Sequence, residues 1–388
     1  MSNWKTGLAM LLAASLVTAA NASTAQPQSK QVLSDVYTIE KKYLSMEGPA
    51  SLLRVHLGDP AKPEVVWLTA IRTEVVGEDG KTPASPELMC HLNVDLDAQR
   101  HQTLFKLKRT VQSRLVTVSQ GMSTAPGIYE ARVPKGFGFP LASNEALLVY
   151  TQVLNLNIDN PANIKVRHRV TFEYLRDQDL KEPIKPLFNL AASGMVILQD
   201  NPLAIPMTPP PAASGSSGLE VGGGGHGATC LVLPRAPNAA GMNSDYVDPS
   251  GRRLTGHWVV PPGRQVNHSD VSWFLGLPYD VTVHYAAVHL HPFAKSLALK
   301  DAKTGKTIFE AKAKSPEGRL GLEHVDSYAS STGFRLKKNA QYQLISVYDN
   351  PLDRNVDSMA SMFFGAVDPE FVKPTPAELA SRATEYAI

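Results

Sequence analysis

The sequence predicts an all-β protein with two antiparallel β-sandwich domains joined by a linker. Short runs alternate apolar and polar residues, which is typical of half-buried antiparallel strands. No helical period is sustained before the last few residues, and one Pro/Gly-rich segment divides the chain. The chain has 388 residues, of which 43% are hydrophobic and 19% charged. That length is sufficient for two cores, and the composition is that of a globular protein.

The clearest strand is "NIKVRHRVTFEYL", residues 163–175. Apolar side chains and one histidine occupy one face: Ile164, Val166, His168, Val170, Phe172 and Tyr174. Charged residues dominate the other face, so we expect one side to pack against a core and His168 to be a core residue. The runs "RLVTVSQ" and "EALLVYTQVLNLN" are further β-rich segments between turn signals.

The linker is "PMTPPPAASGSSGLEVGGGGHG", residues 206–227, which is too rich in Pro, Ser and Gly to pack. We therefore predict one β-domain over 24–205 and a second over 228–370. The tail, 371–388, contains "PTPAELASRATEY". This segment can form a short helix, with Thr375 as its N-cap and Pro376 at its first position.

Residues 1–22 have the features of an export signal: Lys5, an apolar run over about 7–17, and Ala20-Asn21-Ala22. The apolar run is too short to span a bilayer, and no other segment approaches that length. We therefore expect an exported protein, either periplasmic or secreted. In an oxidising compartment Cys90 and Cys230 are a natural disulfide pair, although two buried thiols are the alternative.

Partner classes are limited by charge and by motifs. The formal net charge is +2, without a dense Lys/Arg stripe, so no nucleic-acid partner is expected. Hydrolase motifs such as G-x-S-x-G and HExxH do not occur.

Two histidines lie one residue apart in the predicted strand 281–291. His289 and His291 share a face, with Cα atoms about 7 Å apart, so both imidazoles can bind one metal ion. Histidines in a core or in solvent leave the same pattern. Downstream, Met359 lies near the start of the last predicted strand and shares a face with Ser361, whereas Met362 points the other way. Core packing is the alternative role for both methionines.

Residues 257–299, which include "VPPGRQVNHSDVS" and "VHLH", and the later "DNPLDRNVDSMASMFF" resemble the second lobe of the copper type II, ascorbate-dependent monooxygenases. The resemblance covers about residues 255–365. It implies two jelly-roll sandwiches with an open cleft between them. It also implies one copper ion with His289, His291 and Met359 as ligands, a position open to O₂, and ascorbate or another external reductant. The substrate would be a small molecule or a peptide.

The first lobe departs from that family. Its members hold a second copper there with an adjacent His-His pair and a later strand histidine. This chain has Cys90-His91 and Leu154 at the corresponding places. A second metal site at His91 is therefore not expected, and one copper ion is.

The remaining histidines are candidates for a supporting role beside the metal site. His324 is a candidate to orient a ligand through its ring N–H, and His284 is one only where a bulge turns it toward the ion. A structural or surface role is the alternative for both and is favoured. The roles of His226, His257 and His268 stay open.

Three functions remain. The first is an exported mono-copper oxidoreductase, a candidate copper-dependent monooxygenase. The second is a non-catalytic copper-binding or carrier protein. The third is a metal-free jelly-roll protein for adhesion or carbohydrate recognition.

Overall fold

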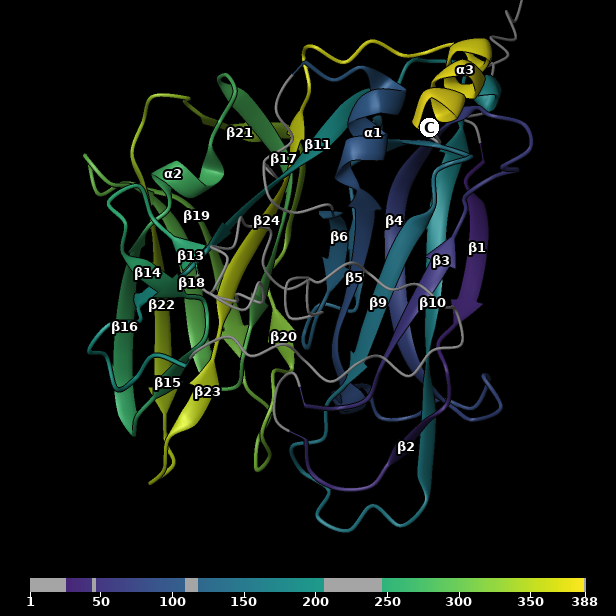
Figure 1. Ribbon diagram of the computed structural model, residues 1–388. Helices are drawn as coiled ribbons and strands as arrows, with labels where there is room; N and C mark the ends of the chain where they lie inside the picture. The colour runs from purple at the N-terminus through teal and green to yellow at the C-terminus, as the bar shows by residue number, and fades with distance from the viewer. Residues whose placement is uncertain (1–25, 44–46, 109–117, 206–245, 387–388) are drawn as a thin grey trace, which may run out of the picture.

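The computed structural model describes residues 26–43, 47–108, 118–205 and 246–386. These residues are mostly β-strand, which confirms the all-β prediction. Two sandwiches lie side by side, with the first half of the chain forming one and the second half most of the other (Figure 1).

The first sandwich consists of two sheets. In order across the first sheet lie β1 (Gln28–Leu33), β10 (Ile164–Arg176), β4 (Val65–Gly77) and β8 (Phe137–Ala142), with β2 (Tyr37–Ile39) and β7 (Glu130–Arg132) at its margins. The second sheet contains β3 (Ala50–Val55), β9 (Leu147–Val153), β5 (Met89–Asp97) and β6 (Val118–Thr124). The even-numbered residues of β10 from Val166 to Tyr174 are buried, as their alternation predicts.

The second sandwich repeats this plan. One sheet contains β11 (Lys185–Ser193), β24 (Ala360–Val367), β17 (Val281–Leu290) and β21 (Tyr328–Leu336). The facing sheet contains β16 (Gly263–Asp270), β22 (Tyr342–Asn350), β18 (Ala294–Asp301), β19 (Thr307–Lys314) and β20 (His324–Val325).

The strand order identifies both sandwiches as jelly rolls. When the main strands of each half are numbered in chain order, one sheet reads 1-8-3-6 and the other reads 2-7-4-5 in both halves. This arrangement follows when a long hairpin folds over on itself, which gives two facing antiparallel sheets. The predicted pair of jelly-roll sandwiches is therefore present.

The two sandwiches share a continuous sheet. β8 of the first half pairs in parallel with β11, with Phe137 opposite Lys185, and β11 then pairs with β24 of the second half. The second sandwich thus recruits β11, although this strand lies inside the segment 24–205 predicted as the first domain. A Pro/Gly-rich composition predicts a linker, but it does not say which sheet a strand joins.

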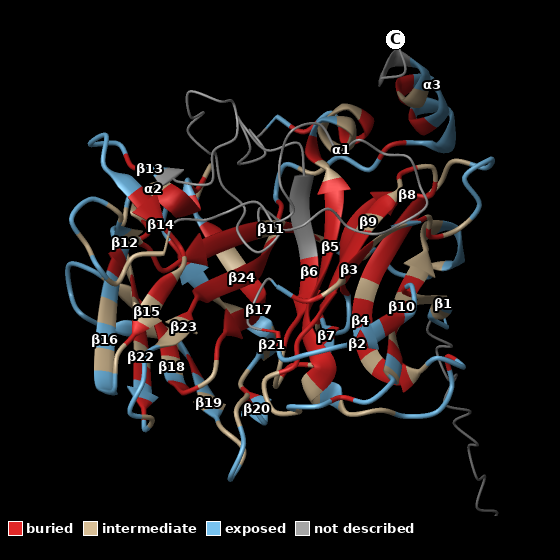
Figure 2. Ribbon diagram, turned by 60° about the horizontal axis from the view of Figure 1, so that its bottom comes forward, coloured by how far each residue is buried: buried red, intermediate tan, exposed pale blue. Residues whose placement is uncertain are grey.

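At the junction the central strands of the two sandwiches are largely buried, and cavities of about 30 and 160 Å³ have walls from both halves. β5, β17 and β24 are buried over almost every residue and β11 over most of its length, as Figure 2 shows. A strand buried on both faces needs a second layer on each side. Gly365 illustrates how close the halves lie: a Cβ there would come within 2.9 Å of the ring of Phe139 in the first sandwich.

Short strands and helices complete the fold. The short strands are β12 (Val196–Ile197), β13 (Tyr246–Val247), β14 (Arg253–Thr255), β15 (Trp258–Val260) and β23 (Val356–Ser358). The helices are η1 (Pro86–Leu88), α1 (Ala98–Phe105), η2 (Asp177–Asp179), α2 (Ser272–Leu275) and α3 (Pro376–Tyr386). Among the described residues we find no helix whose length and apolar content would let it span a bilayer.

The predicted helix of the tail is confirmed as α3. Thr375 and Glu378 form a capping box, in which the Thr375 hydroxyl accepts from the Glu378 backbone N–H and the Glu378 carboxylate accepts from the Thr375 N–H. The helix docks on α1 of the first sandwich, where Arg382 donates a 2.8 Å hydrogen bond to the carbonyl of Leu104.

Candidate metal centre

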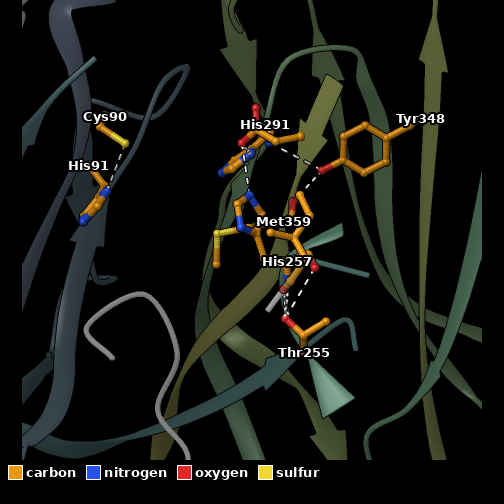
Figure 3. A network of polar contacts seen from close by, with 9 residues as sticks. Cys90, His91, Thr255, His257, His291, Tyr348 and Met359 are labelled. Atoms are coloured by element: carbon orange, nitrogen blue, oxygen red, sulfur yellow. Dashed lines mark hydrogen bonds and ion pairs between the residues drawn. The ribbon is translucent and has the colours of Figure 1, made fainter. Parts of the chain in front are cut away.

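The three residues that the sequence singled out as ligands lie on neighbouring segments of the second sandwich. In the antiparallel pair β17–β24, His289 lies opposite Ser361 and Leu290 opposite Ala360, so His291 and Met359 are the next residues beyond this end of the pairing. Directly opposed residues of an antiparallel pair project on the same face. All three side chains are buried, and Figure 3 shows His291 and Met359 in one network. Met362 lies opposite Val288 on the other face, as expected.

Tyr348 connects the two segments that carry His291 and Met359. This tyrosine lies on β22 of the facing sheet and is fully buried. Its hydroxyl accepts from the backbone N–H of His291 at 3.4 Å and donates to the backbone carbonyl of Met359. Because one hydroxyl satisfies both groups, it fixes the spacing of the two backbones.

Asp357 lies between two histidines. One carboxylate oxygen lies 3.1 Å from Nδ1 of His291 and 3.2 Å from Nε2 of His257. Burial raises the pKa of Asp357, but the hydrogen bonds from both rings outweigh it and hold that pKa well below its usual range. The charge of the carboxylate beside Nδ1 favours the tautomer of His291 that carries its proton on Nδ1, which would leave Nε2 for a metal ion.

The partnership of His257 and Asp357 was not predicted. The sequence leaves the role of His257 open, and it shows Asp357 only as the acidic residue of "DSM" within "DNPLDRNVDSMASMFF". The two residues are 100 positions apart, and the pairing of β15 with β23 brings them together, with Val259 opposite Asp357. A signal was available only in the acidic residue two places before Met359.

His289 presents an unused ring nitrogen. Its side chain is 4% exposed, and Nε2 has no hydrogen-bond partner among the described residues. Burial, followed by repulsion from His291 and His91, lowers the pKa of His289 well below its ordinary value. The ring is therefore neutral, which is the form that binds a metal ion.

A small cavity opens onto these rings. It has room of about 30 Å³, and its walls include Cys90 and Leu154 from the first sandwich and His289, His291 and Asp357 from the second. This room is about the share of one water molecule, so a single ion fits. A neighbouring cavity of about 160 Å³ shares five wall residues with it and gives a route to the rings: Pro126, Leu154, Leu156, Gly321 and Leu322.

His91 does not form a separate site. It lies on β5 of the first sandwich, yet its ring centroid is 5.9 Å from that of His289. Burial, followed by repulsion from His291 and His168, lowers the pKa of His91 to about 3. From the sequence alone His91 belongs to a separate, incomplete site in the first lobe. Its contact with His289 of the second sandwich could not be predicted from the sequence.

His284 and His324 do not take the orienting role expected of them. A bulge does occur at His284, but its Nδ1 bonds to the carbonyl of Ser330 at 2.8 Å and its ring stacks on Phe137. His324 is exposed and lies 3.2 Å from Asp326. Asp357 occupies the orienting position instead, because its strand lies directly beside the segment of His291.

Several predictions lie outside the described residues. These are the export signal 1–22, the whole linker 206–227, His226 and Cys230. Cys90 is buried, and its pairing with Cys230 stays a prediction. His268 is exposed on β16, and His168 is confirmed as a core residue, with hydrogen bonds to Thr151 and to the Leu88 carbonyl.

The donor set fits copper. Two imidazoles and a thioether suit Cu(I), because polarisable ligands prefer the softer ion. A harder set shares His291: the ligand atoms of His257, His291 and Asp357 lie within 4.8 Å of one another, and such a set suits zinc or iron. Each set has two members in the wall of the cavity, His289 and His291 for the first and His291 and Asp357 for the second. The buried, unpartnered Nε2 of His289 favours the first set.

No family model matches this chain. No curated protein matches it either. Among solved structures, it is similar to the major capsid protein P2 of bacteriophage PM2, at 9% identity over 88% of this chain and 100% of that one, with a TM-score of 0.29. A structure of PNGF-II is similar at 9% identity over 85% of this chain and 65% of that one, also with a TM-score of 0.29. We take no functional argument from likenesses this distant.

Proposed function

We propose that this chain is an exported protein that binds one copper ion through His289, His291 and Met359 and holds it without turnover. The observation that carries the proposal is Nε2 of His289, which is buried without a partner beside a cavity large enough for one ion. A buried imidazole nitrogen without a hydrogen bond costs about 1–3 kcal/mol, which ion binding would offset. Bound there, copper would supply a redox-active, electrophilic centre.

Holding is favoured over catalysis by the size of the cavity. Substrate pockets of enzymes usually enclose about 300–1,000 Å³. The space beside His289 and His291 is about 30 Å³. This chain also lacks two of the three histidines that hold the electron-relay copper in the monooxygenases, since Cys90 and Leu154 stand in their places.

The second candidate is a copper-dependent monooxygenase with ascorbate or another external reductant. The neighbouring cavity, about 160 Å³, favours it by giving a small molecule or peptide side chain a route toward the rings. Such a reaction would place one atom of O₂ in a C–H bond of the substrate. The other atom would be reduced to water with two electrons and two protons from the reductant.

The third candidate, a metal-free adhesion or carbohydrate-binding protein, has less support. It would leave the orphan nitrogen of His289 and the oriented ring of His291 without a role. A protein used only for adhesion gains nothing from buried neutral imidazoles that carry a desolvation cost.

Copper stoichiometry tests the proposal. The purified mature protein is expected to bind one copper ion, and His289→Ala and His291→Ala to lose it. His268→Ala is the matched control, since that ring is exposed on the same sandwich. Unchanged copper binding by His289→Ala would refute the proposal. Ascorbate-driven O₂ uptake above that of free copper would move the assignment from holder to oxidoreductase.

A further inference from the structure

β5 carries an irregularity at the point where it meets the second sandwich. In its pairing with β9, Met89 lies opposite Val153 and His91 lies opposite Gln152, so Cys90 is an extra residue. A β-bulge of this kind interrupts the strict alternation of side chains and re-aims the residues beside it. Accordingly, Nδ1 of His91 lies 3.3 Å from Sγ of Cys90, where a regular strand would place the two on opposite faces.

The bulge turns this part of β5 toward the rings of β17. The centroid of the His91 ring lies 5.9 Å from that of His289, with the two planes perpendicular. The centroid of His289 in turn lies 5.2 Å from that of His291. Cys90 lines the same cavity as these two histidines. Three buried imidazoles from two sandwiches thus lie next to one another, and two of them, those of His289 and His291, line the cavity.

We propose that His91 is a further ligand of the copper site, so that the bound ion joins the first sandwich to the second. The inference rests on the proposed function and deepens it. Three imidazoles and the thioether of Met359 would complete a four-coordinate shell for Cu(I), which suits a protein that holds its ion. The buried and unpartnered Nε2 of His289, aimed into the shared cavity, is the independent sign of a ligand there.

Donors from both halves also explain the placement of the bulge. A jelly roll does not need an extra residue in β5 for its own pairing, because β9 and β6 continue regularly over Leu92 to Val94. Bulges that recur beside functional sites re-aim a side chain at some cost in ladder hydrogen bonds. Here the side chains re-aimed are those that face His289.

The first test counts ligands in the wild-type protein. X-ray absorption at the copper edge of the Cu(I)-loaded chain is expected to fit three imidazoles and one sulfur. Two imidazoles and one sulfur would overturn the inference. The readout needs no variant, so it is independent of any effect of substitution on folding.

The second test compares Cu(I) affinity in competition with a chromophoric chelator. His91→Gln is expected to weaken Cu(I) binding by at least about 10-fold. His56→Gln is the matched control, because His56 also belongs to the first sandwich but bonds to the carbonyl of Ser143. Thermal unfolding followed by near-UV circular dichroism checks that both variants are folded and equally stable before their affinities are compared.

Hydrogen exchange reports the link between the sandwiches directly. Copper is expected to slow exchange of β5 amides in the wild type, and His91→Gln to lose that effect while β17 keeps it. Wild-type β5 that exchanges at the same rate with and without copper would contradict the inference. If His289→Ala loses copper and His91→Gln does not, only this inference fails. If His289→Ala binds copper normally, the proposed function fails as well.

Discussion

The hydroxyl of Tyr348 donates a hydrogen bond to the backbone carbonyl of Met359 from the opposite sheet of the second sandwich. The same oxygen accepts from the N–H of His291. One phenol therefore holds the start of β24 against the end of β17, and the predicted ligands meet at that point. Tyr348 thus sets the spacing of the segments that carry His291 and Met359 through hydrogen bonds to their backbone groups.

Tyr348→Phe is expected to loosen this arrangement. The change removes one buried hydroxyl and leaves the carbonyl of Met359 without its donor, which costs about 1–3 kcal/mol of unfolding free energy. Copper affinity should fall as well, because the two ligand segments are no longer held in register. Urea unfolding and copper titration measure the two effects. Tyr129→Phe, whose hydroxyl is at the surface near Pro86, should change neither.

Met359→Leu separates the soft ligand from its packing role. Leucine and methionine have similar volumes, so the loss of stability should stay below about 1.5 kcal/mol. Without the thioether, binding of Cu(I) should weaken more than binding of Cu(II), and the reduction potential should fall. Potentiometry on the loaded protein measures the shift. Met362→Leu, on the opposite face of β24, is the control, and an equal shift there would argue that packing alone is responsible.

Asp357→Asn tests the carboxylate that orients His291. The amide keeps the shape of the side chain but removes the charge that fixes the proton on Nδ1, so copper affinity should fall by about 10–100-fold. Asp349→Asn, exposed on β22, is the control. Stronger binding of zinc than of copper by the wild type, lost in Asp357→Asn, would instead favour the set formed by His257, His291 and Asp357.

Asp95 gives the protein a pH-dependent stability. This residue is buried on β5, and burial raises its pKa to about 8. Because the folded state binds the proton more tightly than the unfolded chain, unfolding free energy should fall as pH rises from about 4 to about 8. Asp95→Asn removes this pH dependence, so the unfolding free energy of the variant relative to that of the wild type should rise from pH 4 to pH 8. Urea unfolding at pH 4.5 and 8.5 checks it, and an equal difference at both values would contradict the assignment.

The pairing of Cys90 with Cys230 is open to direct mapping. Peptides from the unreduced, exported protein should include one that links the two cysteines. Removal of a native disulfide usually costs about 2–5 kcal/mol, so reduction should lower the unfolding midpoint. Alkylation of both thiols in denaturant without a reductant would show instead that they are unpaired.

The sequence by itself determined the features that depend on near neighbours. Alternation over 164–174 predicted the buried face of β10, and Thr375 followed by Pro376 predicted the start of α3. His289 and His291 are two residues apart, so strand geometry alone placed them on one face. Their meeting with Met359 required only that two adjacent strands pair in one register.

Tertiary structure decided the rest of the candidate site. His257 and Asp357 meet only because β15 pairs with β23, and His91 reaches His289 only because a bulge in β5 lies against the second sandwich. β11 likewise joins the second sheet across the predicted domain boundary. A residue pattern reports which side of a strand is buried, because that depends on a period of two. It does not report which distant strand covers that side, because packing of the whole chain selects the partner.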